Sequence, residues 1–271
     1  MSFLKKTVIL TFMALGLFSF KGLVFAQETK NTPAPTPISE ISELDSKREM
    51  LSDALKASND ELKELREGIN SIKVENDGWQ KIKEDLLAQA DKSKDYYDEA
   101  NDKLKSEDID LGTIKTLAKE LKSFRETTFR EYLKKSINFI LVFEVADLLK
   151  IADSRLDKIS SDIDRLQRQS ISKSKPLRVL FSQAQKYLKL SHNLNDSAKK
   201  LLYSDFEFLN QETLDEKSGG EEIKSNTELP EITRPEKQPA DSQDIIRDMS
   251  QKSLEELMNT YYSFVKMSKS L

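Results

Sequence analysis

The stretch INFILVFEVADLLKIA, residues 137–152, decides the fold class of this chain. Twelve of its sixteen residues are apolar. On a helix, which turns about 100° per residue, the charged residues Glu144, Asp147 and Lys150 form one narrow polar stripe. A helix that is apolar over most of its circumference must be covered by neighbours on several sides. We therefore expect residues 137–152 to form the central buried helix of an all-α protein.

Two other structures are compatible with so apolar a stretch. A membrane span needs roughly 20 mainly apolar residues, and a charge at mid-bilayer costs about 2.5–3.5 kcal/mol on insertion scales. Three charges within sixteen residues therefore argue against a span. The run FILVF, residues 139–143, is β-prone and resembles an aggregation segment. Helical periodicity on both sides, without a flanking hairpin turn, favours a helix there as well.

Residues 38–74 have apolar residues at alternating spacings of three and four, the pattern of a coiled-coil helix. The seam positions are Ile41, Leu44, Arg48, Leu51, Leu55, Ser58, Leu62, Leu65, Ile69 and Ile72. Arg48 and Ser58 are the polar positions of this seam. Either the seam runs along the solvent edge of a bundle, which is the interpretation we favour, or these residues form a polar layer that sets the helix register.

Residues 76–78, Asn-Asp-Gly, are the first helix breaker. They either turn the chain or kink a continuous helix. Ile72, Trp79 and Leu86 are seven residues apart, so the seam crosses Gly78 nearly in phase, which favours a kinked, nearly continuous helix. Trp79 is expected to be a bulky core anchor rather than a ligand platform.

No Gly or Pro interrupts residues 113–175, which predicts one long helix that contains the central stretch. Asp110 or Thr113 is expected to cap its start. Its seam should pass through Thr128 and Leu133.

A further helix is expected to begin near Ser174, with Pro176 in its first turn, and to continue to about residue 209. Connections as short as these favour antiparallel neighbours. We therefore predict that residues 38–214 form an elongated antiparallel helical bundle with coiled-coil segments.

The first 26 residues have the pattern of a secretory signal peptide. Lys5 and Lys6 precede an apolar run over residues 7–20, and Val24 with Ala26 predicts cleavage after Ala26; an uncleaved anchor is the alternative. The protein is then exported, to the periplasm or the surface of a bacterium. Residues 27–37 are rich in Pro and Thr and are expected to be an extended spacer.

Residues 215–240 are expected to be a disordered acidic linker, because they contain Gly219-Gly220 and three prolines but few large apolar side chains. Residues 241–271 predict a tethered amphipathic helix capped by Ser242. Its apolar positions are Ile245, Ile246, Met249, Leu254, Leu257, Tyr261, Phe264 and Val265. This helix either folds back onto the bundle, which we favour, or is presented to a partner.

The composition argues against an enzyme. The chain has no cysteine and one histidine, His192, so a typical zinc site or a di-metal site with Glu-x-x-His pairs is not expected. No glycine-rich phosphate loop occurs, and the carboxylates alternate with lysines as on a solvated helix face. We therefore predict no catalytic residue, cofactor or metal.

One basic cluster exceeds this background, because residues 165–195 contain no acidic side chain. Its cations are Arg165, Arg168, Lys173, Lys175, Arg178, Lys186 and Lys189. If residues 170–175 form a hairpin tip, these side chains gather at one end and could bind anionic lipid or a cell-wall or host polymer. The alternative, which we favour, is ordinary charge complementarity at the end of a helix.

The sequence thus predicts a non-enzymatic exported bacterial envelope or surface protein that acts through protein–protein or anionic-surface contacts, as a scaffold or adhesin does. A periplasmic holdase or assembly factor and a peripheral membrane-surface protein are the alternatives. The helical seams also permit homo-oligomers. Nucleic acid is not an expected partner, because the net charge is −4, and −7 once Lys5, Lys6 and Lys21 are removed with the signal peptide (−4 − 3 = −7).

Overall fold

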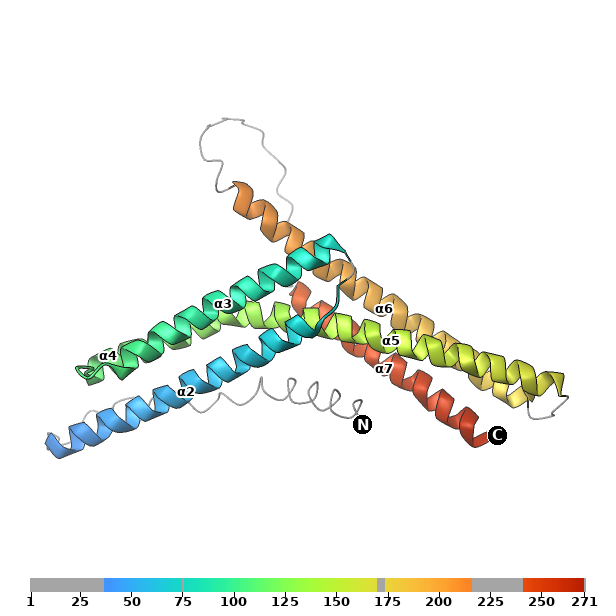
Figure 1. Ribbon diagram of the computed structural model, residues 1–271, viewed down its shortest axis with the longest axis horizontal. Coiled ribbons are helices and arrows are strands. Elements are labelled where there is room, and N and C mark those ends of the chain that lie inside the picture. The colour runs from blue at the N-terminus through green and yellow to red at the C-terminus, as the bar shows by residue number, and fades with distance from the viewer. Residues whose placement is uncertain (1–36, 75, 170–173, 216–240, 271) are drawn as a thin grey trace, which may run out of the picture. The chain divides into compact units, whose positions relative to one another are not determined.

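Every element in the described part of the chain is a helix (Figure 1). The computed structural model describes residues 37–74, 76–169, 174–215 and 241–270. The elements are α2 (Pro37–Ser71), α3 (Asp77–Lys105), α4 (Leu111–Phe124), the π-helical turn η1 (Arg125–Phe129), α5 (Arg130–Arg168), α6 (Ser174–Asp215) and α7 (Ser242–Ser270). The protein is all-α, as predicted.

The chain divides into two compact units, Met1–Ser46 and Lys47–Leu271, and all contacts given below lie within the second. Of the first unit, the described part is the opening of α2. The predicted signal peptide, spacer and acidic linker lie outside the described residues, apart from Pro37 and Asp215, which belong to α2 and α6.

The chain reverses between α2 and α3, so the predicted kinked continuous helix is wrong. Arg48 Nε on α2 donates to the Leu104 carbonyl on α3 at 2.9 Å, whereas one continuous helix would separate these residues by about 84 Å. Lys83 Nζ closes the turn by donating to the Ile72 carbonyl at 2.7 Å. Asn76 Oδ1 caps α3 by accepting from the Trp79 amide at 2.9 Å. The seven-residue spacing across Gly78 is compatible with a hairpin as well, because each helix of a hairpin has its own apolar face.

The predicted seam is buried from Leu51 onward, and Ser58 is part of its interior. Leu44 and Arg48 are half-buried, and the side chain of Ile41 lies outside the described residues. Leu55, Leu65 and Ile69 are almost completely buried. Ser58 is 1% exposed, so the interpretation of a seam along the solvent edge is wrong at this position. Ser58 Oγ donates to the Ala54 carbonyl at 2.8 Å, which satisfies its hydrogen within α2.

The long helix over residues 113–175 is interrupted by a π-turn that the sequence did not predict. Asp110 caps α4 by accepting from the Thr113 amide at 2.6 Å, as expected. At η1 the helix takes up one extra residue, which shifts the buried face by one position. Thr128, predicted on the seam, is therefore exposed, and Phe129 is buried in its place.

α5 takes part in two three-helix bundles and is covered on several sides, as its apolar stretch requires (Figure 1). The first bundle consists of three helical segments: α2 from Lys47 onward, α3, and the continuous segment of α4, η1 and the first half of α5. The second bundle is the remainder of α5 with α6 and α7. Phe139 and Val142 of α5 are fully buried, while Asp147 and Lys150 of the predicted polar stripe are exposed.

An aromatic cluster joins the two bundles. Trp79 of α3 lies edge-on to Phe143 of α5 and to Tyr203 of α6, with ring centroids 5.0 and 5.2 Å apart. The Trp79 ring also lies 6.3 Å from that of Phe139. Contacts of this kind stabilise beyond the area they bury, so Trp79 packs as the anchor that the sequence suggested.

α7 packs against α5 and α6, which confirms that it folds back and excludes the alternative of a free helix on a tether. It is antiparallel to α6, because Ser253 contacts Ser191 while Ser242 contacts Asp205. Asp241 rather than Ser242 caps it: Asp241 Oδ1 accepts from the Gln243 amide at 3.1 Å. The Ser242 hydroxyl instead donates to Asp205.

The buried face of α7 combines part of the predicted apolar stripe, Ile246 and Leu257, with small hydroxyl side chains. Ser250, Ser253 and Thr260 are fully buried, while Val265 is 51% exposed. The hydroxyls of Ser250 and Thr260 donate to carbonyls one turn back. Small side chains at the contact let two helices approach closely, so α7 turns part of its apolar surface outward.

Candidate functional site

The predicted basic cluster is partly neutralised where α5 ends and α6 begins. Arg165 Nη2 lies 3.3 Å from Asp162 Oδ1 on its own helix. Arg178 of α6 reaches back to α5, where it hydrogen-bonds Gln167 and lies 3.8 Å from Asp164. Asp162 and Asp164 precede residue 165 and therefore lie outside the acid-free run of residues 165–195.

Among the remaining predicted cations, three have side chains that the structure describes. Arg168, Lys186 and Lys189 are exposed. Lys189 follows Arg178 by eleven residues, which places it about 16 Å further along α6. Lys173 and the side chain of Lys175 lie outside the described residues.

The exposed large apolar side chains are concentrated on the second bundle. Of the eight in the described ranges, Met50 lies on α2 and the other seven lie on α5, α6 or α7. These seven are Ile151, Val179, Tyr187, Leu190, Met258, Tyr262 and Val265. Contiguous exposed apolar surface marks interaction sites more often than isolated residues do, so the second bundle is the candidate interaction surface.

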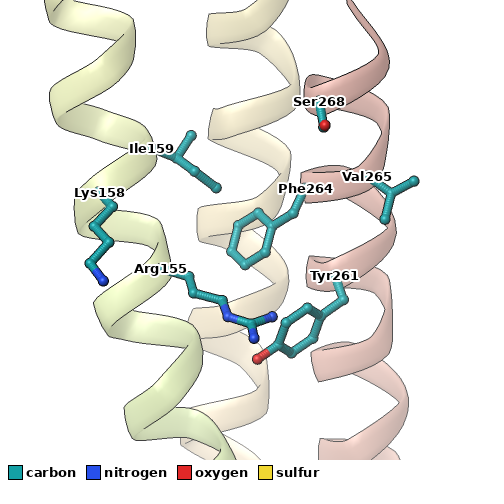
Figure 2. A pocket seen from close by; sticks show the side chains of 7 residues that line it. All are labelled: Arg155, Lys158, Ile159, Tyr261, Phe264, Val265 and Ser268. Atoms are coloured by element: carbon teal, nitrogen blue, oxygen red, sulfur yellow. The ribbon is translucent and has the colours of Figure 1, made fainter. Parts of the chain in front are cut away.

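An open pocket of about 330 Å³ lies between α5 and α7 (Figure 2). It is lined by Arg155, Lys158, Ile159, Tyr261, Phe264, Val265 and Ser268. Ile159 and Phe264 point toward each other from the two helices, with α6 behind them. Both pack against the buried cluster of Ile163 and Met267 and so form an apolar floor.

Cations flank this floor. The Arg155 guanidinium lies 5.0 Å from the ring centroid of Tyr261, a cation–π contact between α5 and α7. Lys158 follows on the next turn of α5. Within the described part of the chain neither cation forms an ion pair. The positive charge of this rim is therefore not neutralised by a neighbouring carboxylate.

The rim continues beyond the pocket along both helices. Ile151 lies one turn before Arg155 on the same face of α5 and is 40% exposed. On α7, Met258 lies seven residues before Val265, and both are more than half exposed. Lys269 lies one turn after Val265 and adds a further exposed cation. Together with the pocket, these residues form what we call the α5/α7 groove.

The sequence prediction missed this groove. None of the seven predicted cations lines it. The available signal was the run Met258, Tyr262 and Val265, spaced four and three apart as a second apolar stripe on α7. This stripe is exposed only because Ser253 and Thr260 are on the buried face of α7 instead. The pattern of apolar residues alone does not predict that these two residues are buried.

Two other polar groupings have structural partners. His192 Nε2 on α6 lies 3.1 Å from both carboxylate oxygens of Asp153 on α5 and so ties the two helices together. In the first bundle, Arg125 donates to Ser58 Oγ at 2.7 Å and to Glu61 at 2.8 Å. Burial raises the pKa of the neighbouring Tyr97 hydroxyl to about 12.

Among the described residues, no group of three or more His, Asp or Glu side chains is arranged to hold a metal ion. No helix in the described ranges combines the length and apolarity that crossing a membrane requires. No protein-family model matches the chain, and neither a curated protein nor a solved structure resembles it at a significant level.

Proposed function

We propose that this protein is a non-enzymatic, exported bacterial envelope or surface protein that binds a protein partner through its second bundle. The observation that carries the proposal is the location of seven of the eight exposed large apolar side chains on α5, α6 and α7. Keeping such side chains in water is costly, at about 25 cal/mol per Å² of apolar surface. A partner that covers them gains that free energy.

The location of the partner surface can be tested by site-specific photocrosslinking in cells that express the full chain. A photoreactive amino acid replaces Val179, Tyr187 or Tyr262 in turn, and replaces Met50 on the first bundle as the matched exposed control. The proposal expects discrete crosslinked species from the three positions on the second bundle and none from Met50. Equal crosslinking from Met50, or none from any position, would contradict it.

The proposed export rests on the basic and apolar pattern of residues 1–26 and fits the absence of cysteine. N-terminal sequencing of the protein recovered from cells should begin at Gln27. Protease treatment of intact cells and of cells with a permeabilised envelope then separates surface from periplasm. A chain that resists protease under both conditions would rule the proposed export out, and a chain that retains Met1 would identify the uncleaved anchor in place of a cleaved signal peptide.

A membrane-surface or polymer-binding role is a second candidate, because Arg168, Lys186 and Lys189 are exposed cations. Co-sedimentation with phosphatidylglycerol vesicles tests it, and binding should weaken as salt screens the charges. A holdase role has its own test: stoichiometric suppression of the aggregation of an unfolded client.

A further inference from the structure

The α5/α7 groove combines an apolar floor, exposed apolar rims and unneutralised cations. We propose that it binds an amphipathic helix of a partner protein, one whose apolar stripe is flanked by acidic residues. This inference rests on the proposed function, since it names the partner surface within the second bundle and the chemistry that fits it.

The dimensions of the groove match two turns of helix. Ile151 to Lys158 on α5 and Met258 to Val265 on α7 each span seven residues, or about 10.5 Å. A docked helix presents anchors at i, i+3, i+4 and i+7 over the same length. The pocket of about 330 Å³ above Ile159 and Phe264 gives one such anchor a recess to enter.

The charge of the rim selects an acidic partner. Arg155 and Lys158 line the pocket, and Lys269 lies one turn beyond Val265. The acidic residue nearest along this face of α5, Asp162, is already paired with Arg165. Carboxylates flanking the apolar stripe of a docked helix would meet these cations, while a basic helix would be repelled.

The acidic segment 216–240 of the same chain is too short to be the occupant. The segment is anchored by Asp215 on one side and by Asp241 on the other. Asp215 ends α6, ten residues beyond Asp205, which contacts Ser242 at the start of α7. Travelling to the level of Phe264 and back requires about 85 Å of chain at 1.5 Å per helical residue. Twenty-five residues span at most about 90 Å when fully extended, which leaves too few to form a helix in the groove.

The position of the pocket floor between two helices favours a protein helix over a bilayer. Helices that lie on membranes bury a projecting apolar face in the headgroup region. Here Ile159 and Phe264 lie between two helices, where a side chain can reach them more readily than a flat lipid surface can.

The test is fluorescence-polarisation binding of the full mature chain to three labelled peptides of about 15 residues, long enough for a marginal helix. All three carry Leu and Phe at i, i+3, i+4 and i+7, and their flanking positions are all Glu, all Gln or all Lys. We expect the Glu peptide to bind about tenfold more tightly than the Lys peptide, with the difference shrinking at high salt.

The chain supplies matched control variants. Arg155→Gln with Lys158→Gln removes two cations three residues apart from the groove, and Lys186→Gln with Lys189→Gln removes two at the same spacing from α6. Val265→Ser has its counterpart in Val179→Ser, since both valines are more than half exposed. The groove variants should weaken binding of the Glu peptide about tenfold. The control variants should weaken it by less than about twofold. Thermal melts establish that all four variants fold.

Four outcomes of the binding measurements would overturn the inference. They are no peptide binding, equal binding of the Glu and Lys peptides, groove variants no weaker than their controls, and groove-dependent binding to phosphatidylglycerol vesicles in place of the peptide. Self-association abolished by Val265→Ser would likewise overturn it, by assigning the groove to a second copy. Crosslinking at Tyr187 and Tyr262 without peptide binding would retain the proposed function while rejecting the acidic helix.

Discussion

The side-chain amide of Asn138 on α5 donates to two oxygens of Gln243 on α7, the backbone carbonyl at 2.7 Å and the side-chain Oε1 at 2.8 Å. Both residues are buried. Asp205 of α6 accepts from Ser242 at 2.6 Å and also from Gln243. Polar contacts therefore fix the start of α7 against both of its neighbours, and the position of α7 sets the width of the groove.

Replacing Asn138 with leucine should weaken the docking of α7. The variant leaves two buried oxygens of Gln243 without their donor, so we expect the free energy of unfolding to fall by about 1–3 kcal/mol. Urea titration followed by circular dichroism measures it. Asn193→Leu, an exposed position on α6, is the control and should change stability by less than about 0.5 kcal/mol. Equal losses in the two variants would show that the Asn138 contact does not hold α7.

The ion pair between Lys134 and Asp241 should make stability depend on pH at the acid end. Its hydrogen bond lowers the pKa of Asp241 below 3.8 and raises that of Lys134 above 10.5. The contribution of Asp241 to the free energy of unfolding is therefore complete above pH 3.8. It is lost as the pH falls through the lower pKa of the folded state. The contribution of Lys134 to the free energy of unfolding is complete below pH 10.5. It is lost as the pH rises through the raised pKa of Lys134 in the folded state.

Asp241→Asn keeps a helix-capping side chain and removes the charge. Because the pair is partly exposed, we expect the variant to be less stable by about 0.2–1 kcal/mol at neutral pH. Urea midpoints measured down to about pH 2.5 should show the two proteins converging below 3.8. A difference that stays constant with pH would attribute the loss to the cap rather than to the charge.

Deleting Thr128 should remove the π-turn without disturbing the core. The deletion brings the buried Phe129 to a position seven residues after Leu121, which is the spacing of a regular heptad. We expect a cooperative thermal transition and a loss of at most about 2 kcal/mol. Deleting the exposed Asp147 instead rotates every later side chain of α5 by about 100° and should abolish cooperative unfolding. Equal damage from both deletions would mean that the π-turn is required for the fold.

Gly78→Ala should destabilise the junction of the two bundles. A methyl group at position 78 would lie 2.5 Å from Tyr203 Oη and 3.0 Å from its ring, which is fixed by Trp79. Overpacking of this kind costs about 1–3 kcal/mol. In Gly68→Ala the added methyl group would meet only the end of the flexible Ile140 side chain. A gain in helix propensity of about 1 kcal/mol opposes the cost of that contact.

A double-mutant cycle in urea separates the two effects at position 78. Tyr203→Leu should relieve Gly78→Ala with a coupling energy above about 0.5 kcal/mol. Additive losses would show that the clash with Tyr203 is not the cause.

Much of the helical structure could be predicted from spacing alone. The buried seams of α2 and α3, the cap at Asp110 and the burial of Phe139 follow from the 3.6-residue period and from local hydrogen bonding. The direction of the chain after Ile72 could not be predicted in this way, because the apolar spacing across Gly78 is compatible with both a kinked helix and a hairpin.

The candidate site depended far more on packing between helices than on any local pattern. The acid-free run suggested a cluster of cations, but Arg178 packs back onto Asp164, an acidic residue that precedes the run. On α7, hydrophobicity placed Val265 inside, whereas close contact with α6 buries Ser253 and leaves Val265 at the groove.

The sequence by itself determined which segments are helical and which face of most helices is apolar, because both depend on residues within a turn or two of each other. Only the tertiary structure decided which helices are neighbours, that η1 takes up an extra residue, and that Arg155 and Val265 share one groove. The physical reason is that α7 carries two faces able to pack. Which one is buried depends on the fit of small hydroxyl side chains against Ser191 on α6, a residue 62 positions from Ser253.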